Sequence, residues 1–260
     1  MTTYERVTFE GTHGTLAGAI DLPGKPPEAY ALFAHCFTGG KDYPATRRIC
    51  RELTKRGLAV LRFDFTGVGE SGGEFADSTF SSNVADVRLA AQYLRDHHEA
   101  PTLLVGHSLG GAAVLAAAPD LPGVAAVATI GAPGEPAHVA HLFAHALDDI
   151  VANGEAEVIL GGRAFRIRAD FVDDLREQEQ DAKIARLDRP LLIIHAPEDE
   201  IVGISNAEHI YRAARHPKSF VALDGADHLL TDRRQAHRVA QLITAWADPY
   251  LPETFTPEID

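Results

Sequence analysis

Short aliphatic runs alternate with longer segments of helical periodicity along almost the whole chain. Runs such as residues 30–34 and 58–63 lack the polar alternation of a half-exposed strand, which is typical of strands buried on both faces. Segments such as residues 78–97 repeat apolar side chains at the spacing of an amphipathic helix. This alternation predicts the α/β class, in which a mainly parallel sheet is covered by helices on both faces.

The pattern predicts eight strands in one sheet. We expect them at residues 6–10, 15–22, 30–34, 58–63, 102–106, 124–130, 190–195 and 219–223. The first two are flanked by Gly and Pro and are expected to form an antiparallel pair. We expect helices at residues 43–56, 78–97, 109–118 and 234–247. Ser78 is expected to cap the second of these helices. We therefore expect a single domain over residues 1–260, with a linker-like tail at 248–260.

One stretch interrupts this pattern, because the gap from Gly131 to Pro190 is too long for a strand–helix–strand crossover. We expect a small cap insertion at residues 134–189. Its expected elements are a helix at 137–150, a β-hairpin of 157–160 and 163–168 around a Gly-Gly turn, and a helix at 171–185. An insertion above the carboxyl edge of a parallel sheet would cover a ligand crevice.

Charge and cysteine content exclude several function classes. The 260 residues carry 24 Lys+Arg against 37 Asp+Glu, a formal charge of −13, which disfavours a nucleic-acid partner. Cys36 and Cys50 are too few for a disulfide framework and indicate a reducing compartment. No secretory signal is visible, and the apolar stretch 111–118 is far shorter than the roughly 20 residues that span a bilayer. We expect a cytoplasmic protein without a membrane partner.

The most specific motif is Gly-His-Ser-Leu-Gly at residues 106–110, between a predicted buried strand and an Ala-rich helix. Its two glycines keep Cβ atoms away where the strand and the helix nearly touch, and the sharp turn presents Ser108 at the sheet edge. The alternative is a chance Gly-x-Ser-x-Gly in a flexible turn. The context favours Ser108 as a nucleophile.

A serine nucleophile needs a base, and the base needs a carboxylate to orient it. His228 follows the last predicted strand and precedes the last helix, where the chain returns to the same sheet edge. Three acidic residues follow strand 190–195. We choose Asp199, because a short side chain suits a tight turn and apolar residues follow it, and Glu198 is the alternative.

Two aimed donors are needed for an oxyanion. We expect them to be the backbone N–H groups of Leu109, at the start of a helix, and of Phe37, in the loop after strand 30–34. Asp64 is a competing candidate for the catalytic acid, but bracing the loop beneath the site is the favoured role.

Several segments together resemble the α/β-hydrolase family over essentially the whole chain. They are His-Cys-Phe-Thr-Gly at 35–39, Asp-Phe-Thr-Gly-Val-Gly-Glu-Ser at 64–71, residues 106–111, Asp199 with Val202, and Ala-Asp-His at 226–228. More narrowly, residues 36–38, 130–133, 165–168 and 215–220 resemble the hydrolase half of bacterial proteins fused to an osmotically inducible protein C-like domain.

The resemblance implies the α/β-hydrolase fold and a serine esterase triad of Ser108, Asp199 and His228. It also implies a natural fusion partner outside these residues. We expect a hydrolase that cleaves carboxylic esters of small or medium acyl or aryl groups through an acyl-enzyme. The alternatives are a thioesterase or perhydrolase with the same triad, or a catalytically silent ligand-binding module.

Substrate contacts are expected from both the body and the insertion. The candidates are Cys36, His107, Leu142, Phe143, Phe165 and Phe171. The alternative for the insertion residues is that they pack the cap onto the body. Neither a cofactor nor a metal is expected, and an exposed edge or cap surface could support a homodimer.

Two further features have competing interpretations. Cys36 stands where many α/β-hydrolases have glycine after the histidine, so it could narrow the pocket or make activity oxidant-sensitive; a small buried hydrophobe is the favoured alternative. His138, His141 and His145 share one helix face, but no second segment completes a metal shell, which favours polar residues of the cap.

Overall fold

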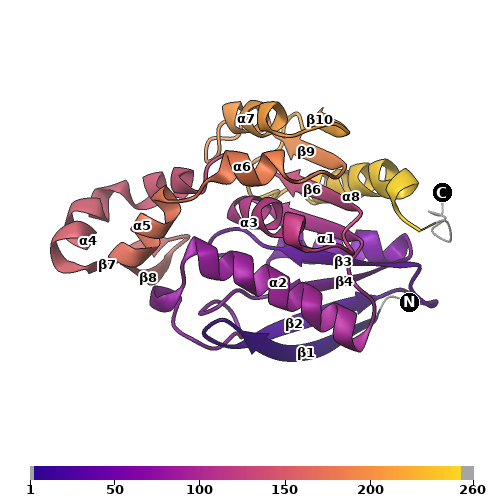
Figure 1. The fold of residues 1–260 in the computed structure, drawn as a ribbon, viewed down its shortest axis with the longest axis horizontal. Coiled ribbons are helices and arrows are strands. Elements are labelled where there is room, and N and C mark those ends of the chain that lie inside the picture. The colour runs from indigo at the N-terminus through magenta and orange to yellow at the C-terminus, as the bar shows by residue number, and fades with distance from the viewer. Residues whose placement is uncertain (1–2, 253–260) are drawn as a thin grey trace.

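A computed structural model describes residues 3–252 (Figure 1). Its main sheet has the strand order β1-β2-β4-β3-β5-β6-β9-β10. The strands are β1 (Thr3–Gly11), β2 (Gly14–Leu22), β3 (Ala29–Ala34), β4 (Leu58–Phe63), β5 (Leu103–His107), β6 (Ala126–Ile130), β9 (Leu191–His195) and β10 (Lys218–Ala222). β2 runs antiparallel to both β1 and β4, and the other neighbours are parallel. The predicted eight-stranded, mostly parallel sheet is confirmed.

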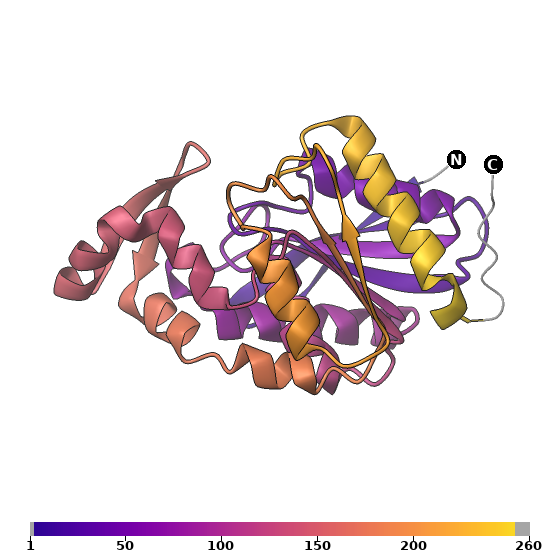
Figure 2. The same cartoon turned by 90° about the horizontal axis from the view of Figure 1, so that it is seen from above.

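Helices cover both faces of this sheet. They are α1 (Pro44–Lys55), α2 (Phe80–His97), α3 (Leu109–Ala117), α7 (Ser205–Ala213) and α8 (Arg233–Ala247). In Figure 2, α8 (yellow) lies on one side of the sheet and α7 (orange) on the other. Two apolar layers result, one between the sheet and α1 with α8, and the other between the sheet and α2, α3 and α7.

The two layers explain why the central strands lack polar alternation. Every residue of β3 and of β4 is buried. Successive side chains of a strand point to opposite faces. Leu32 and Leu61 accordingly pack in the layer of α2 and α3, whereas Phe33 and Val60 pack in the layer of α1 and α8.

Two helices differ from the sequence prediction. α2 begins at Phe80, because the Thr79 side chain accepts from the Ser82 amide (3.0 Å) and the Ser82 hydroxyl accepts from the Thr79 amide (2.8 Å). Thr79 is therefore the N-cap, and Ser78 instead donates to the Phe75 carbonyl (2.7 Å). α7 was not predicted. It is short and has no side-chain cap, and its buried residues are only Ala207 and Ile210.

The chain between β6 and β9 forms an insertion that extends to one side of the body (Figures 1 and 2). Its elements are the 3-10 helix η3 (Pro136–Ala146), α4 (Leu147–Asn153), β7 (Glu155–Leu160), β8 (Arg163–Arg168), α5 (Ala169–Arg176) and α6 (Gln180–Ala185). The predicted β-hairpin is confirmed, with Gly161 and Gly162 at positive φ in its turn.

The predicted helices of the insertion are each divided. Phe143 has non-helical dihedral angles (φ −128°, ψ 27°) within η3, so the first part is not one regular helix. The second helix is broken after Arg176, where the Gln178 side chain donates to the Asp174 carbonyl (2.8 Å).

Short 3-10 turns complete the described chain. They are η1 (Phe75–Asp77), η2 (Ala118–Asp120) and η4 (Asp248–Tyr250). Residues 253–260 of the predicted tail lie outside the described residues. Over residues 3–252, each helix is too short or too polar to cross a membrane.

Candidate active site

Ser108 lies in a sharp turn between β5 and α3, at the carboxyl edge of the sheet. Its backbone has φ 55° and ψ −126°, a conformation that residues other than glycine rarely adopt. The turn is held because the Ser108 amide donates to the Ile130 carbonyl (2.9 Å) and its own carbonyl accepts from the Gly111 amide (2.8 Å). These bonds project the hydroxyl away from the end of β5.

The flanking glycines are required by close backbone approaches. A Cβ on Gly106 would lie 2.4 Å from the Gly110 carbonyl oxygen, and a Cβ on Gly110 would lie 2.3 Å from the His35 carbonyl oxygen. The first contact brings strand and helix together. The second holds α3 against the loop of residues 35–40, called the oxyanion loop below.

We expect Gly110→Ala to destabilise the protein by about 1–3 kcal/mol, as overpacked sites do. Helix propensity alone would favour alanine by about 1 kcal/mol. A loss of folding stability in this variant would therefore come from the steric clash. Urea denaturation measures the change. The matched control is Gly203→Ala, since a Cβ there meets only the Ser205 hydroxyl at 4.0 Å. Equal stability of the two variants would contradict the explanation.

Three side chains form one hydrogen-bonded chain at this edge. His228 Nε2 lies 3.0 Å from Ser108 Oγ, and His228 Nδ1 lies 2.7 Å from Asp199 Oδ2. All three residues are buried. Glu198, the alternative acid, is exposed. The geometry therefore brings Asp199 rather than Glu198 to the histidine.

The Asp199 carboxylate is held by further donors. Its Oδ1 accepts from the amides of Ile201 (2.9 Å) and Val202 (2.8 Å). Burial opposes the charge, but the hydrogen bonds from His228 and from these amides outweigh burial and lower the pKa of Asp199. A charged Asp199 accepts the Nδ1–H of His228, which leaves Nε2 free to accept the Ser108 proton.

The expectation that His107 contacts substrate is wrong, because its side chain is buried. It is 2% exposed, and its Nε2–H donates to the His228 carbonyl (2.8 Å). Burial and the neighbouring His228 lower the pKa of His107 to about 3. The neutral ring fixes the backbone of His228 instead of lining a pocket.

A buried neutral His107 makes the stability dependent on pH. Its pKa is about 3 in the folded chain against the ordinary 6.5. Between these values the unfolded chain binds the extra proton, so stability falls as pH decreases, by up to about 1.4 kcal/mol per pH unit. We expect His107→Gln, which keeps a donor, to flatten this slope in urea denaturation between pH 7 and 4. An unchanged slope would show that His107 does not contribute.

The oxyanion loop is fixed by hydrogen bonds on both sides of His35. The His35 Nδ1–H donates to the Cys36 carbonyl (2.8 Å), and Nε2 accepts from the Phe65 amide (3.2 Å). Within residues 3–252, the amides of Phe37 and Leu109 donate to no protein acceptor. These two N–H groups are therefore available to an oxyanion.

Asp64 lies beneath this loop. It accepts from the Lys41 amide (2.6 Å), from Lys41 Nζ (2.8 Å) and from the Glu70 amide (3.0 Å). A Cβ on Gly69 would lie 2.3 Å from its Oδ2. These bonds connect the end of the oxyanion loop to the loop after β4. They are the contacts expected if Asp64 braces the loop.

Two cavities adjoin the oxyanion loop. A narrow one of about 10 Å³ is lined by Phe37 and Leu109 together with Phe65, Val68 and Phe75. A larger groove of about 570 Å³ follows the outer side of the loop, from Leu229 to Glu70, and reaches Gly161 and Arg163 of the β7–β8 hairpin. Below it is called the loop groove.

Cys36 lines both cavities, and its expected contact with substrate stays a prediction. It is 5% exposed, and burial raises the pKa of its thiol to about 11. The thiol is therefore neutral at physiological pH, and it packs as a small apolar group.

The aromatic residues of the insertion mostly pack it onto the body. Phe143 is fully buried, and Phe171 stacks on Phe37 with ring centroids 5.6 Å apart. Leu142 packs against the same core. Burial of Phe143 and Phe171 corrects their expected role in binding substrate. Leu142 is only partly buried, so its expected role stays a prediction. Phe165 contacts Phe75 (4.7 Å) and lines a separate groove of about 490 Å³.

Residues missed from the sequence include Arg163 and Leu229, which border the loop groove. Arg163 directly follows the Gly-Gly turn, and Leu229 directly follows His228. Turn position and adjacency to the base are the signals that could have found them.

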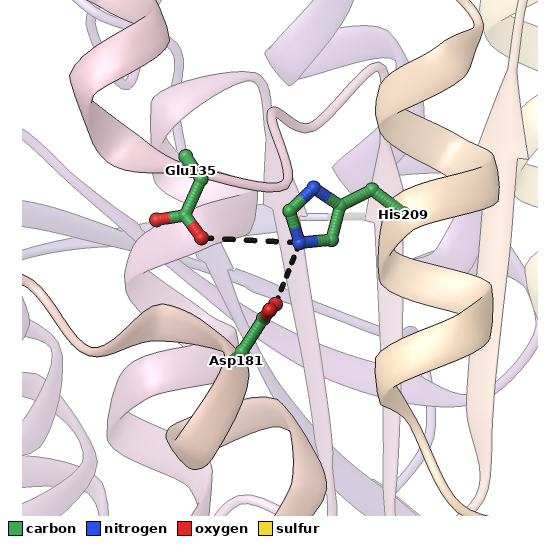
Figure 3. Close-up of side chains that lie close together, drawn as sticks. All are labelled: Glu135, Asp181 and His209. Atoms are coloured by element: carbon green, nitrogen blue, oxygen red, sulfur yellow. Dashed lines mark hydrogen bonds and ion pairs between the residues drawn. The ribbon is translucent and has the colours of Figure 1, made fainter.

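Possible metal ligands lie elsewhere. The rings of His138 and His141 lie 4.7 Å apart, and their nitrogens contact the carbonyls of Ile201 and His138. Within residues 3–252, one ligand atom each of Glu135, Asp181 and His209 lies within 4.8 Å of the others (Figure 3). His209 Nε2 is 2.6 Å from Asp181 and 3.8 Å from Glu135. These residue types are ligands that a divalent cation takes in proteins. The hydrogen bond between His209 and Asp181 joins the insertion to α7.

A Ser–His–Asp chain at the carboxyl edge of a mostly parallel sheet, beside two free amide donors, is typical of an α/β-hydrolase. Residues 26–154 match the family model described as serine aminopeptidase, S33. A crystal structure of the esterase domain of a Rhodothermus marinus protein is 49% identical, covers 96% of this chain and 100% of that chain, and has a TM-score of 0.79. The chain belongs to the α/β-hydrolase family and is a hydrolase.

Two further relatives are similar to this chain in sequence. The protein YfhR of Salmonella typhi is 27% identical over 234 residues, which are 86% of this chain and 74% of the relative. The mitochondrial palmitoyl-protein thioesterase ABHD10 of Rattus norvegicus is 39% identical over 79 residues, 30% of this chain and 25% of the relative.

Proposed function

We propose that this protein is a serine hydrolase that cleaves carboxylic esters through an acyl-enzyme. The observation that carries the proposal is the hydrogen-bonded chain from Asp199 through His228 to Ser108. The 49% identity to an esterase domain supports the ester bond as the target.

In the first half-reaction, Ser108 Oγ attacks the ester carbonyl while His228 Nε2 accepts its proton. The carbonyl oxygen becomes negative and accepts from the amides of Phe37 and Leu109. Asp199 stabilises the imidazolium. His228 then gives the proton to the departing alcohol, which leaves the acyl group on Ser108.

Water completes the reaction. His228 takes one proton from the water as its oxygen adds to the acyl carbonyl, and the same two amides hold the second oxyanion. The bond to Ser108 breaks, His228 returns the proton to Oγ, and the carboxylic acid departs.

The narrow cavity beside the two amides supports a short acyl group and leaves no room for an aryl ring. Its volume of about 10 Å³ leaves little room beyond the two amides. The phenyl rings of Phe65 and Phe75 and the Val68 side chain make its lining apolar. A short apolar acyl group fits these walls better than a long chain.

A thioesterase is the second candidate, favoured by the local similarity to a palmitoyl-protein thioesterase. The same triad and the same oxyanion donors can cleave an ester or a thioester, so the two reactions differ only in the leaving group. Matched ester and thioester substrates with the same acyl group separate the two by their kcat/KM ratio.

Labelling of the native protein with a fluorophosphonate tests the proposal. Trypsin should release residues 96–163 as one peptide in which Ser108 is the only serine. We expect the adduct on this peptide. Folded protein that remains unlabelled would favour a catalytically silent binding module.

A further inference from the structure

The loop groove adjoins the residues that would hold an ester carbonyl. Phe37, whose amide is one oxyanion donor, lines it at one side, and Leu229, next to His228, lines it at the other. An ester bound between these groups has its acyl or its alcohol half beside the groove. Its volume of about 570 Å³ is enough for either half.

Most charged groups in this groove are paired. Lys41 Nζ contacts Asp64 (2.8 Å) and Glu70 (2.6 Å). Asp42 contacts Arg62 (2.8 Å), and this bond lowers its pKa against the effect of partial burial. These charges are therefore already satisfied by the protein.

Arg163 is different. Within residues 3–252, no carboxylate lies within ion-pair distance of its guanidinium. Other arginines of the same hairpin are paired, since Arg166 contacts Glu155 (3.4 Å). The loop groove thus contains one cation that lacks a protein counter-ion.

Arg163 is also held in place. It is the first residue of β8, directly after the Gly161–Gly162 turn. Its guanidinium donates to the Thr38 carbonyl of the oxyanion loop and lies 5.1 Å from the centre of the Phe165 ring. Its charge acts on the Cys36 thiol, where it opposes the effect of burial on the pKa. A guanidinium has five N–H donors, so several remain free.

We propose that Arg163 forms a carboxylate-binding subsite, and that the preferred substrates are esters carrying a free carboxylate. This deepens the proposed ester hydrolysis and rests on it. A planar guanidinium recognises a carboxylate through two parallel hydrogen bonds, and here its stacking and its bond to Thr38 reduce the cost of ordering it. The carboxylate belongs to whichever half of the ester lies beside the groove, and two anionic esters, one for each half, distinguish the two cases.

The experiment compares kcat/KM for three esters of matched length. One is a half-ester of a dicarboxylic acid, one is an ester of a hydroxy acid, and one is neutral. We expect one anionic ester to exceed the neutral ester by roughly 10–100-fold, the value of one charged hydrogen-bonded pair. R163Q should remove this preference, so that the anionic and the neutral ester have similar kcat/KM values when both are measured with the variant. R166Q, which removes the same charge from the same strand, is the matched control.

The outcomes separate this subsite from the proposed function. A wild-type protein without preference, a preference kept in R163Q, or an equal loss in R166Q would each overturn the subsite. Failure on all three esters would instead count against ester hydrolysis. Calorimetry with glutarate then measures the affinity of the subsite for a carboxylate in the absence of ester hydrolysis. We expect weaker binding to R163Q than to R166Q, and equal binding would overturn it.

Discussion

Replacing Ser108 with alanine is expected to lower kcat for ester hydrolysis by roughly 10⁴–10⁶-fold. Alanine has no hydroxyl to attack the carbonyl, so the acyl-enzyme cannot form. The Ser108 hydroxyl contacts only His228 among the hydrogen bonds of residues 3–252, so its loss leaves the fold intact. The burst of released alcohol and the circular dichroism spectrum measure both parts of this expectation.

The matched control is Ser205→Ala, since Ser205 is exposed at the start of α7. It should keep full activity and full labelling by the fluorophosphonate. If Ser108→Ala still hydrolysed esters at a rate near that of the control, another group would be the nucleophile.

Replacing Asp199 with asparagine is expected to lower kcat by roughly 10³–10⁴-fold. The amides of Ile201 and Val202 donate to Oδ1, so they would hold the oxygen of the new side chain at that position. Its NH₂ group would then face His228 Nδ1. That arrangement forces the imidazole proton onto Nε2, which can no longer accept the Ser108 proton.

Glu198→Gln tests the alternative acid in the same assay. Glu198 is exposed and the structure brings it to no catalytic group, so this variant should retain wild-type kcat. A large loss with Glu198→Gln and a small one with Asp199→Asn would reverse the assignment.

The catalytic edge was predictable because its signals are local. The glycines at 106 and 110 lie where a Cβ would meet backbone within 2.5 Å, so the motif itself specifies the turn. Strand ends in a parallel sheet share one edge, which places His228 near Ser108 from their positions alone. The acid was less certain, because three neighbouring carboxylates have the same local pattern. Two backbone amides and the 2.7 Å contact with His228 distinguish Asp199.

Errors arose where one residue type serves two purposes. Phe143 and Phe171 could line a pocket or pack a core, and both are core, because Phe171 packs on Phe37 and Phe143 packs on Phe171. His107 could face substrate, but its ring nitrogen instead donates to the carbonyl of His228, which is distant in the sequence. The helix α7 escaped prediction because only two of its residues are buried and no polar cap marks its start.

By itself, the sequence determined the α/β class, the eight strands and the turn that presents Ser108, since hydrophobic periodicity and glycine positions act over a few residues. Tertiary structure decided which acid meets the histidine and which aromatic residues become core. It also decided that, within residues 3–252, Arg163 is the charged residue of the loop groove that has no counter-ion. These outcomes depend on contacts between segments that are far apart in the chain. A local sequence pattern contains no information about such contacts.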